Sequence, residues 1–265
     1  MRPLQLCVLS FGFCALSFRL DADPLAESQA RFGVVTGDVQ LLSQGARDWI
    51  EAHEGLPIES GDEIETGDDG VAEMELSENV LWLVEPNTHI VTEHMETDRG
   101  RLNLSNGVLL GKVDSKRISI PQQWEFNMPT AVCAVRGTEF ALDVAEPREA
   151  HVGVFEGAVE IQAAESASGQ QPWIRIETGQ EGIAPQKTAV RKASRLSARM
   201  QTYAQKRRDL ESRMHRVQNT WSPYTTTVRN DLRRKFVPPP PPVHQHPRPP
   251  FRRKTSSDTQ DHAAY

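Results

Sequence analysis

Apolar and polar residues alternate in short runs through most of the chain between Phe32 and Ala184. In the run 72–76 three apolar residues are separated by Glu73 and Glu75, and similar runs cover 139–144, 159–162 and 174–177. Alternation with a period of two places one face of a strand in a core and the other face in water, which is typical of half-buried antiparallel strands. We therefore expect the acidic residues of these runs to face solvent.

One run differs, because Val80–Val84 is apolar throughout, and this predicts a strand that is covered on both faces. Glycine-rich and Asp- or Asn-containing turn signals separate the runs at intervals of about 8–12 residues, which indicates a sandwich, a barrel or a β-solenoid. A loose repeat of Gly-Val, at residues 33, 70 and 107, fits stacked hairpins or simply a common way to leave a turn. The predicted fold is all-β, with many short antiparallel strands in a sandwich or β-solenoid-like body.

The pattern changes after Thr188. Apolar residues now recur at spacings of three, four and seven, which predicts one long basic α-helix over residues 190–221. A stripe this narrow fits either a coiled coil or packing on the chain's own β-domain. Arg207 occupies a seam position and weakens a coiled coil, so we favour docking on the body or on a foreign partner, and the oligomeric state stays open. The predicted interaction face is Leu196, Met200, Tyr203, Leu210, Met214 and Val217.

Residues 222–265 are predicted to form a disordered Pro-rich basic tail. Five successive prolines begin at Pro238 and further prolines follow, a composition that favours extended polyproline II without internal hydrogen bonds.

The first 22 residues are typical of an export signal. Arg2 precedes an apolar run of about 15 residues, which Arg19 ends, and this run is shorter than the ~20 residues needed to span a bilayer. A retained anchor is the alternative. With cleavage after Ala22 the mature chain keeps only Cys133, whose apolar neighbours predict a buried, inert thiol. The expected location is the periplasm or cell envelope of a bacterium.

Charge is unevenly distributed along the chain. Residues 23–187 contain 30 acidic and 11 basic residues, whereas residues 188–265 contain 17 basic and 5 acidic residues. A basic tail on an acidic body fits a contact with an anionic membrane surface or an acidic partner, or a tail that folds back on its own body. The negative body has few aromatic residues, which excludes a nucleic-acid platform.

The sequence contains no pattern that predicts catalysis. It has no Gly-x-Ser-x-Gly, no His-Glu-x-x-His and no phosphate-binding loop. Cys133 lacks a neighbouring base, and the turn aspartates are explained by backbone hydrogen bonding. We therefore predict no enzyme activity, no metal site and no cofactor.

Three motifs, in order, resemble the signature of the FecR-type domain family. They are Gly-Asp-Glu-Ile-Glu-Thr-Gly at 61–67, Arg-Gly-Thr-Glu-Phe at 136–140 with its preceding strand, and Val-Phe-Glu-Gly-Ala-Val at 154–159. The resemblance covers residues 31–184 and implies an envelope protein with a β-domain. Gly137 is expected to need a backbone angle that only glycine adopts cheaply, and Arg136 is expected to reach a carboxylate or backbone carbonyls. The motif residues, interpreted as mainly structural, are Gly61, Asp62, Thr66, Gly67, Arg136, Gly137, Thr138, Phe140, Glu156 and Gly157.

The best-known members of this family, as the resemblance implies, are membrane-spanning regulators with a cytoplasmic segment that controls a sigma factor. This chain starts instead with an apparent signal peptide and ends with a basic helix and a Pro-rich tail. The expected layout is a FecR-like β-domain over 30–187 between these ends. The expected function is that of a non-enzymatic envelope interaction or signalling module, with another envelope protein as partner. A structural envelope component, whose basic tail binds anionic lipid or cell-wall polymer, is the alternative.

Overall fold

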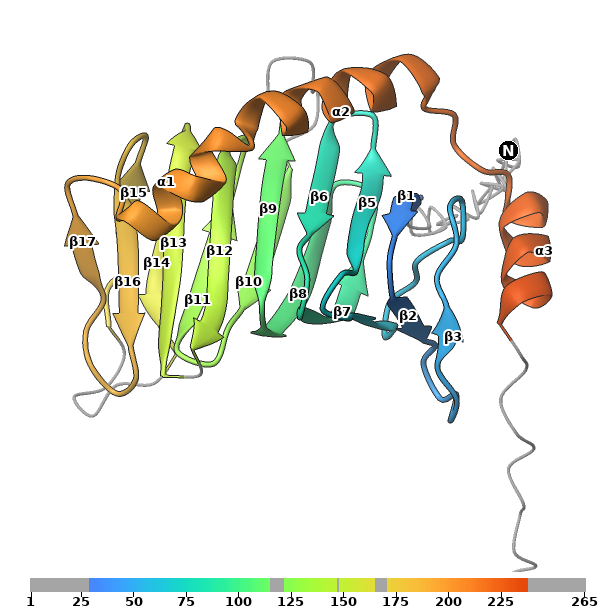
Figure 1. Ribbon diagram of the computed structural model, residues 1–265, viewed down its shortest axis with the longest axis horizontal. Coiled ribbons are helices and arrows are strands. Elements are labelled where there is room, and N and C mark those ends of the chain that lie inside the picture. The colour runs from blue at the N-terminus through green and yellow to red at the C-terminus, as the bar shows by residue number, and fades with distance from the viewer. Residues whose placement is uncertain (1–28, 115–121, 147, 165–170, 238–265) are drawn as a thin grey trace, which may run out of the picture.

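The computed structural model describes residues 29–114, 122–146, 148–164 and 171–237. The proposed signal segment, and the part of the predicted tail after residue 237, lie outside these residues. Two β-sheets form the body and three helices follow them in the chain (Figure 1). The strands are β1 Arg31–Thr36, β2 Val39–Leu42, β3 Ile50–Glu51, β4 Glu63–Thr66, β5 Val71–Ser77, β6 Val80–Val84, β7 His89–Met95, β8 Arg99–Asn106, β9 Val108–Val113, β10 Gln123–Asn127, β11 Ala131–Val135, β12 Glu139–Glu146, β13 Glu149–Glu156, β14 Ala158–Ala163, β15 Ile174–Glu177, β16 Glu181–Pro185 and β17 Arg191–Ala193.

The two sheets face each other, and the chain crosses between them repeatedly as it advances. The eight-stranded sheet has the order β1-β5-β6-β9-β12-β13-β16-β17, and the nine-stranded sheet has the order β15-β14-β11-β10-β8-β7-β4-β2-β3. Neighbours are antiparallel except β8 and β10, which pair in parallel because β9 lies between them in the chain and belongs to the other sheet. The body is therefore a sandwich in which strands are added along one axis, much as in a solenoid.

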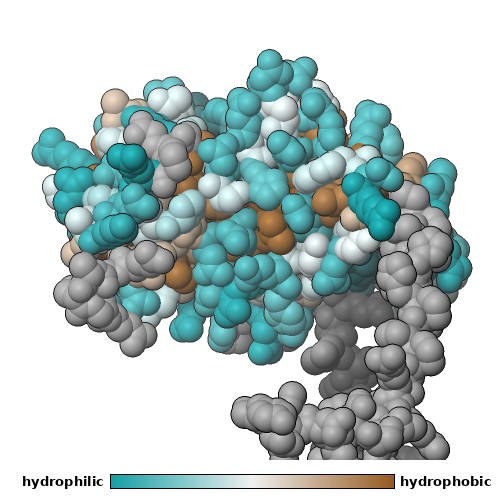
Figure 2. All heavy atoms as spheres, turned by 90° about the horizontal axis from the view of Figure 1, so that it is seen from below, coloured by the Kyte–Doolittle hydropathy of each residue, from teal (hydrophilic) through white to brown (hydrophobic). Residues whose placement is uncertain are grey.

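The core between the sheets is built from the inward half of each alternating run. Its centre is an aromatic cluster in which the Trp82 ring lies 5.4–5.7 Å from the rings of Trp124, Phe126 and Phe140. All four side chains are buried. The strand ends seen from below show hydrophobic residues along the middle, flanked by hydrophilic residues (Figure 2).

A second apolar layer lies on the outer face of the eight-stranded sheet. Helices α1 (Ala198–Gln205) and α2 (Arg207–Thr220) run across the strands there (Figure 1). Leu81 and Leu83 of β6 point into this layer, while Val80, Trp82 and Val84 point into the core between the sheets. The prediction that Val80–Val84 is covered on both faces is thus confirmed.

The helical region differs from the single helix expected over 190–221. Residues 191–193 form β17, which pairs with β16, and the helix starts only after Ser197, whose side chain accepts a hydrogen bond from the Met200 backbone N–H. Lys206 separates α1 from α2. The spacing of the apolar stripe reveals the helix face, but a serine N-cap decides where the helix begins.

A further helix, α3 (Thr226–Phe236), contradicts the expectation that structure ends at residue 221. Thr225 caps its N-terminus by accepting from the Val228 N–H, and three basic residues in its last turn suit the negative end of the helix dipole. Thr225 and α3 thus lie in the part of the chain that was predicted to be a disordered tail. α3 stands beside β1–β3 at one end of the body (Figure 1).

Candidate interaction surfaces

Helices α1 and α2 cover the outer face of the eight-stranded sheet, here called the covered face, through the predicted stripe. Met200, Leu210, Met214 and Val217 are buried, and Leu196 and Tyr203 pack beside them. Fully burying such a side chain contributes about 1.5–3 kcal/mol. The sheet side of the contact is Leu81, Leu83, Val108, Leu110, Ala141 and Phe155.

Acidic residues surround this apolar stripe, and the helices cover them too. Glu73, Glu139 and Asp143 are buried, which corrects the expectation that the polar half of their runs faces water. Each meets basic side chains of the helices: Arg213 and Arg216 contact Glu73, Arg207 bonds Glu139 through two nitrogens at 3.1 Å, and Arg199 with the Tyr203 hydroxyl contacts Asp143. Burial, together with the charge of Asp143, raises the pKa of Tyr203 to about 12.

The start of α1 is held by a buried carboxylate. Glu181 accepts a hydrogen bond from the Ser197 backbone N–H at 2.6 Å and another from His151 Nδ1 at 2.7 Å. The other ring nitrogen of His151 lies 2.9 Å from Glu149. The hydrogen bond to Glu181 raises the pKa of His151, against burial, which lowers it. Burial alone would raise the pKa of Glu181, but the hydrogen bonds from His151 and Ser197 lower it.

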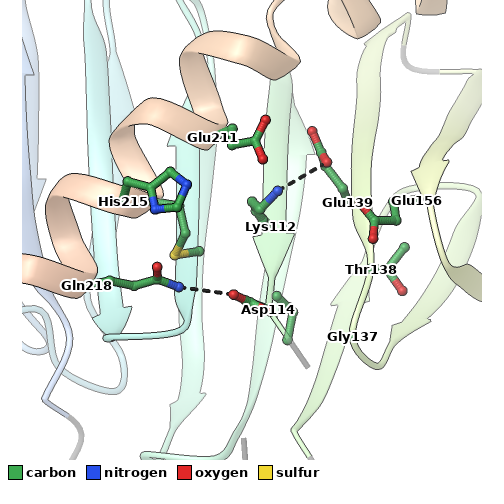
Figure 3. Close-up of a pocket in the computed structure, with 11 residues that line it drawn as sticks. Lys112, Asp114, Gly137, Thr138, Glu139, Glu156, Glu211, His215 and Gln218 are labelled. Carbon is green, nitrogen blue, oxygen red and sulfur yellow. Dashed lines mark hydrogen bonds and ion pairs between the residues drawn. The ribbon is translucent and has the colours of Figure 1, made fainter. Parts of the chain in front are cut away.

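A small cavity of about 120 Å³ remains between α2 and the sheet, next to Gly137 (Figure 3). Four acidic residues line it, but the structure gives partners to those nearest the sheet: Lys112 Nζ lies 3.4 Å from Glu139, and Gln218 Nε2 donates to Asp114 at 3.0 Å. A space of this size holds a few water molecules. We interpret it as a packing gap under the docked helix.

The first predicted motif anchors α3 and the turns. Gly61 has a φ of 85°, and the buried Asp62 accepts two hydrogen bonds from Arg233 of α3, at 2.7 and 3.0 Å. Burial raises the pKa of Asp62 although Arg233 lowers it. Thr66 donates to the Glu85 carbonyl, and the Gly67 N–H donates to the Asp38 carbonyl.

The second and third motifs meet at neighbouring corners between the sheets. Gly137 has a φ of 65° and Gly157 a φ of 85°, so both backbones adopt the left-handed conformation that favours glycine, as expected for Gly137. A Cβ on Gly157 would lie 2.7 Å from the Gly137 carbonyl oxygen. The Thr138 hydroxyl donates to the Ala158 carbonyl at 2.7 Å, and Phe140 lies in the core. Glu156 is paired with Arg207 at 3.6 Å.

Arg136 does not behave as expected. Its side chain is exposed, and within the described chain its guanidinium makes neither a hydrogen bond nor an ion pair, whereas a carboxylate or carbonyl partner was predicted. It lines two hollows on the outer face of the nine-stranded sheet, here called the open face. Helices α1 and α2 lie over the other sheet and do not cover this face (Figure 1).

No group of three His, Cys, Asp or Glu side chains among the described residues could hold a metal ion. Cys133 is free and buried, as predicted, and burial raises the pKa of its thiol, which disfavours the reactive thiolate. His89 of β7 lies 2.7 Å from Ser105 Oγ of β8 and 3.3 Å from Glu63 of β4 on the open face. Because β7 lies between β8 and β4 in the sheet, we assign these contacts to cross-strand pairing.

No helix in the described ranges is long and apolar enough to cross a membrane.

Comparison with known proteins finds a match to one family model. No curated protein sequence is significantly similar to the chain. Two crystal structures, at 1.65 and 2.50 Å resolution, of a protein from Parabacteroides distasonis ATCC 8503 that is provisionally assigned as an anti-sigma factor resemble part of it, each with a TM-score of 0.42 and 16% identity. The match covers 54% of this chain and 64% of theirs.

The family model described as FecR protein matches residues 62–160, which run from β4 to β14 and include all three motifs apart from Gly61. The resemblance inferred from the motifs is therefore confirmed over this range. Over residues 62–160 the chain is therefore similar to the FecR family.

Proposed function

We propose that this protein is an exported, non-enzymatic FecR-domain protein that acts as a signalling or interaction module and contacts another envelope protein through its open face. One observation carries the proposal: the chain's own helices occupy the covered face, whereas the open face keeps two hollows of about 270 and 470 Å³ lined largely by charged and polar residues. A protein partner fits such a surface because protein contacts combine hydrogen bonds and charge pairs with close packing.

The test is site-specific photo-crosslinking in the bacterial envelope. A photoreactive amino acid replaces Glu160, an exposed residue of β14 on the open face, and in a matched variant it replaces Gln201, an exposed residue of α1. We expect one discrete adduct from position 160 and none from position 201. No adduct from position 160, or the same adduct from both positions, would contradict the proposal. Fractionation of the same cells tests export.

The alternative, a structural envelope component held on an anionic surface by its basic C-terminal part, loses much of its basis in the helices. Arg199, Arg207, Arg213 and Arg216 of α1 and α2 pair with carboxylates of the body. The charges for surface binding would then come mainly from residues beyond 237. Sedimentation with anionic vesicles separates the two proposals, because binding by exposed charges should weaken steeply above physiological salt, where the Debye length is about 8 Å.

A further inference from the structure

The side chain of one motif residue, Arg136, makes no hydrogen bond or ion pair within the described part of the chain. Gly137 supplies a left-handed backbone angle, Thr138 ties two corners together, and Phe140 fills the core. Arg136 stands directly before them, yet its guanidinium is exposed and contacts no acceptor in the described chain. A guanidinium carries five N–H donors in a rigid fork that matches a carboxylate.

The position of Arg136 joins the two hollows of the open face. Arg136 and Ala134 line both of them. The hollow of about 270 Å³ extends over β8 and β10, and the hollow of about 470 Å³ extends over β14 and β15. Five neighbouring strands span roughly 19 Å at about 4.8 Å per step, which is the length of about six residues of an extended peptide. The small side chain of Ala134 leaves room for a partner's backbone between the hollows.

The other arginines of this surface already have acidic partners. Arg101 lies 2.7 Å from Glu125, and Arg175 lies 3.8 Å from Glu177. Arg99 lies 3.1 Å from Glu96. Among the described residues this surface is therefore mixed in charge, and Arg136 is an unpaired cation between the two hollows. This composition disfavours a polyanion, which the nearby carboxylates would repel, and it suits a peptide segment with a single well-placed acid.

We infer that Arg136 binds an Asp or Glu side chain of a protein segment that lies across the two hollows of the open face. This inference rests on the proposed function, because it names the partner chemistry of the same surface. Charge-assisted bidentate pairing between arginine and a carboxylate is short and directional, so it would fix the register of the segment.

The experiment uses the full-length protein with the photoreactive residue at position 160. Arg136→Ala is compared with Arg208→Ala, which removes an exposed arginine of α2 far from the open face, and with Arg136→Lys, which keeps the charge but loses the fork. We expect Arg136→Ala to reduce the adduct about ten-fold or more, Arg136→Lys to reduce it less, and Arg208→Ala to leave it unchanged. The melting temperature should be unchanged in all three variants.

The possible failures are distinguishable. A normal adduct in Arg136→Ala contradicts the role of Arg136 and leaves the proposed function standing, whereas no adduct in the parent protein contradicts the proposed function itself. A fall in melting temperature that accompanies the lost adduct assigns Arg136 to the fold and overturns the inference. Mass spectrometry of the adduct then identifies the acidic residue of the partner. The variant Arg136→Glu should lose the adduct, and replacing the partner's acidic residue with arginine should restore it. Failure of this exchange rules out the carboxylate pairing.

Discussion

The docking of α2 on the sheet predicts an asymmetry between the two sides of one ion-pair cluster. Glu73 has no solvent exposure, whereas its partners Arg213 and Arg216 keep 29% and 37% of their side-chain surface exposed. Each arginine has a second acidic contact, Asp209 at 2.9 Å for Arg213 and Glu75 at 3.5 Å for Arg216. Removing the carboxylate therefore leaves cations that can turn to water, but removing the cations leaves a buried anion.

The magnitudes follow from this difference. Glu73→Ala should lower the free energy of unfolding by about 1–2 kcal/mol. This is the usual contribution of a hydrogen bond to a charged group when the group that remains can be hydrated. The double variant Arg213→Met with Arg216→Met keeps the apolar stems of both side chains but leaves the Glu73 carboxylate buried without its cations. It should lower the free energy of unfolding by about 3–5 kcal/mol. The loss of stability has an upper limit, because α2 can detach locally and let Glu73 reach water. Detachment would expose Met214 and Val217, at a cost of about 3–6 kcal/mol. The triple variant, which combines Glu73→Ala with both arginine substitutions, has no buried unpaired carboxylate. It should recover most of the stability that the double variant loses.

Urea unfolding followed by circular dichroism measures these differences, and thermal melting gives a second reading. At about 2–4 °C per kcal/mol for a domain of this size, the double variant should melt roughly 6–20 °C below the parent. Equal destabilisation by Glu73→Ala and by the double arginine variant would contradict this asymmetry. A triple variant that is no more stable than the double would contradict it as well.

Three further predictions use other features of the fold. Gly137→Val should lower the free energy of unfolding by roughly 1–3 kcal/mol, because valine is strained at positive φ. Arg136→Val, one residue earlier at an ordinary φ, is the control in thermal melting. Equal melting temperatures for the two variants would contradict the strain. The raised pKa of His151 stabilises the fold fully below the ordinary histidine pKa of 6.5, and this stabilisation is lost as the pH rises through the pKa of the folded state. His151→Gln should therefore flatten the dependence of unfolding free energy on pH between pH 6 and 9. An unchanged slope would refute this. Light scattering should find that the full-length protein is a monomer. A chain truncated after Arg195 should aggregate, because the apolar residues of the covered face are then exposed. A full-length dimer that becomes a monomer on truncation would instead indicate a coiled coil.

The strands and corners of the body could be predicted from the sequence because their signals are local. Period-two alternation separates inward from outward side chains, and glycine marks the corners that need a positive φ, as at Gly137. The narrow apolar stripe likewise identified residues that face the sheet, although Leu196 precedes α1 and both Leu196 and Tyr203 are only partly buried. Each of these inferences needs only the geometry of one element.

What covers a face could not be predicted in this way. The alternation around Glu73 and Asp143 shows that they share the outward side, but water and a basic helix more than 50 residues later are equally compatible with that pattern. The opposite error occurred at Arg136, where a charged motif residue was expected to have an internal partner. Pairing between distant elements depends on topology, and the local pattern does not contain it.

The contact between α3 and the turn at Asp62 has a consequence for the order in which the molecule is assembled. Arg233 meets Asp62 across 171 residues of sequence, whereas most strands pair with strands that leave the ribosome shortly before or after them. Strands can thus join the growing sandwich one after another during synthesis, but Asp62 lacks its contact with Arg233, and Glu73 lacks its contacts with Arg213 and Arg216, until the C-terminal segment is made. Non-local contacts of this kind form late because their loop-closure entropy is large. The half-made protein therefore presents an acidic surface with an apolar centre, which is the surface a chaperone would meet before the helices close over it.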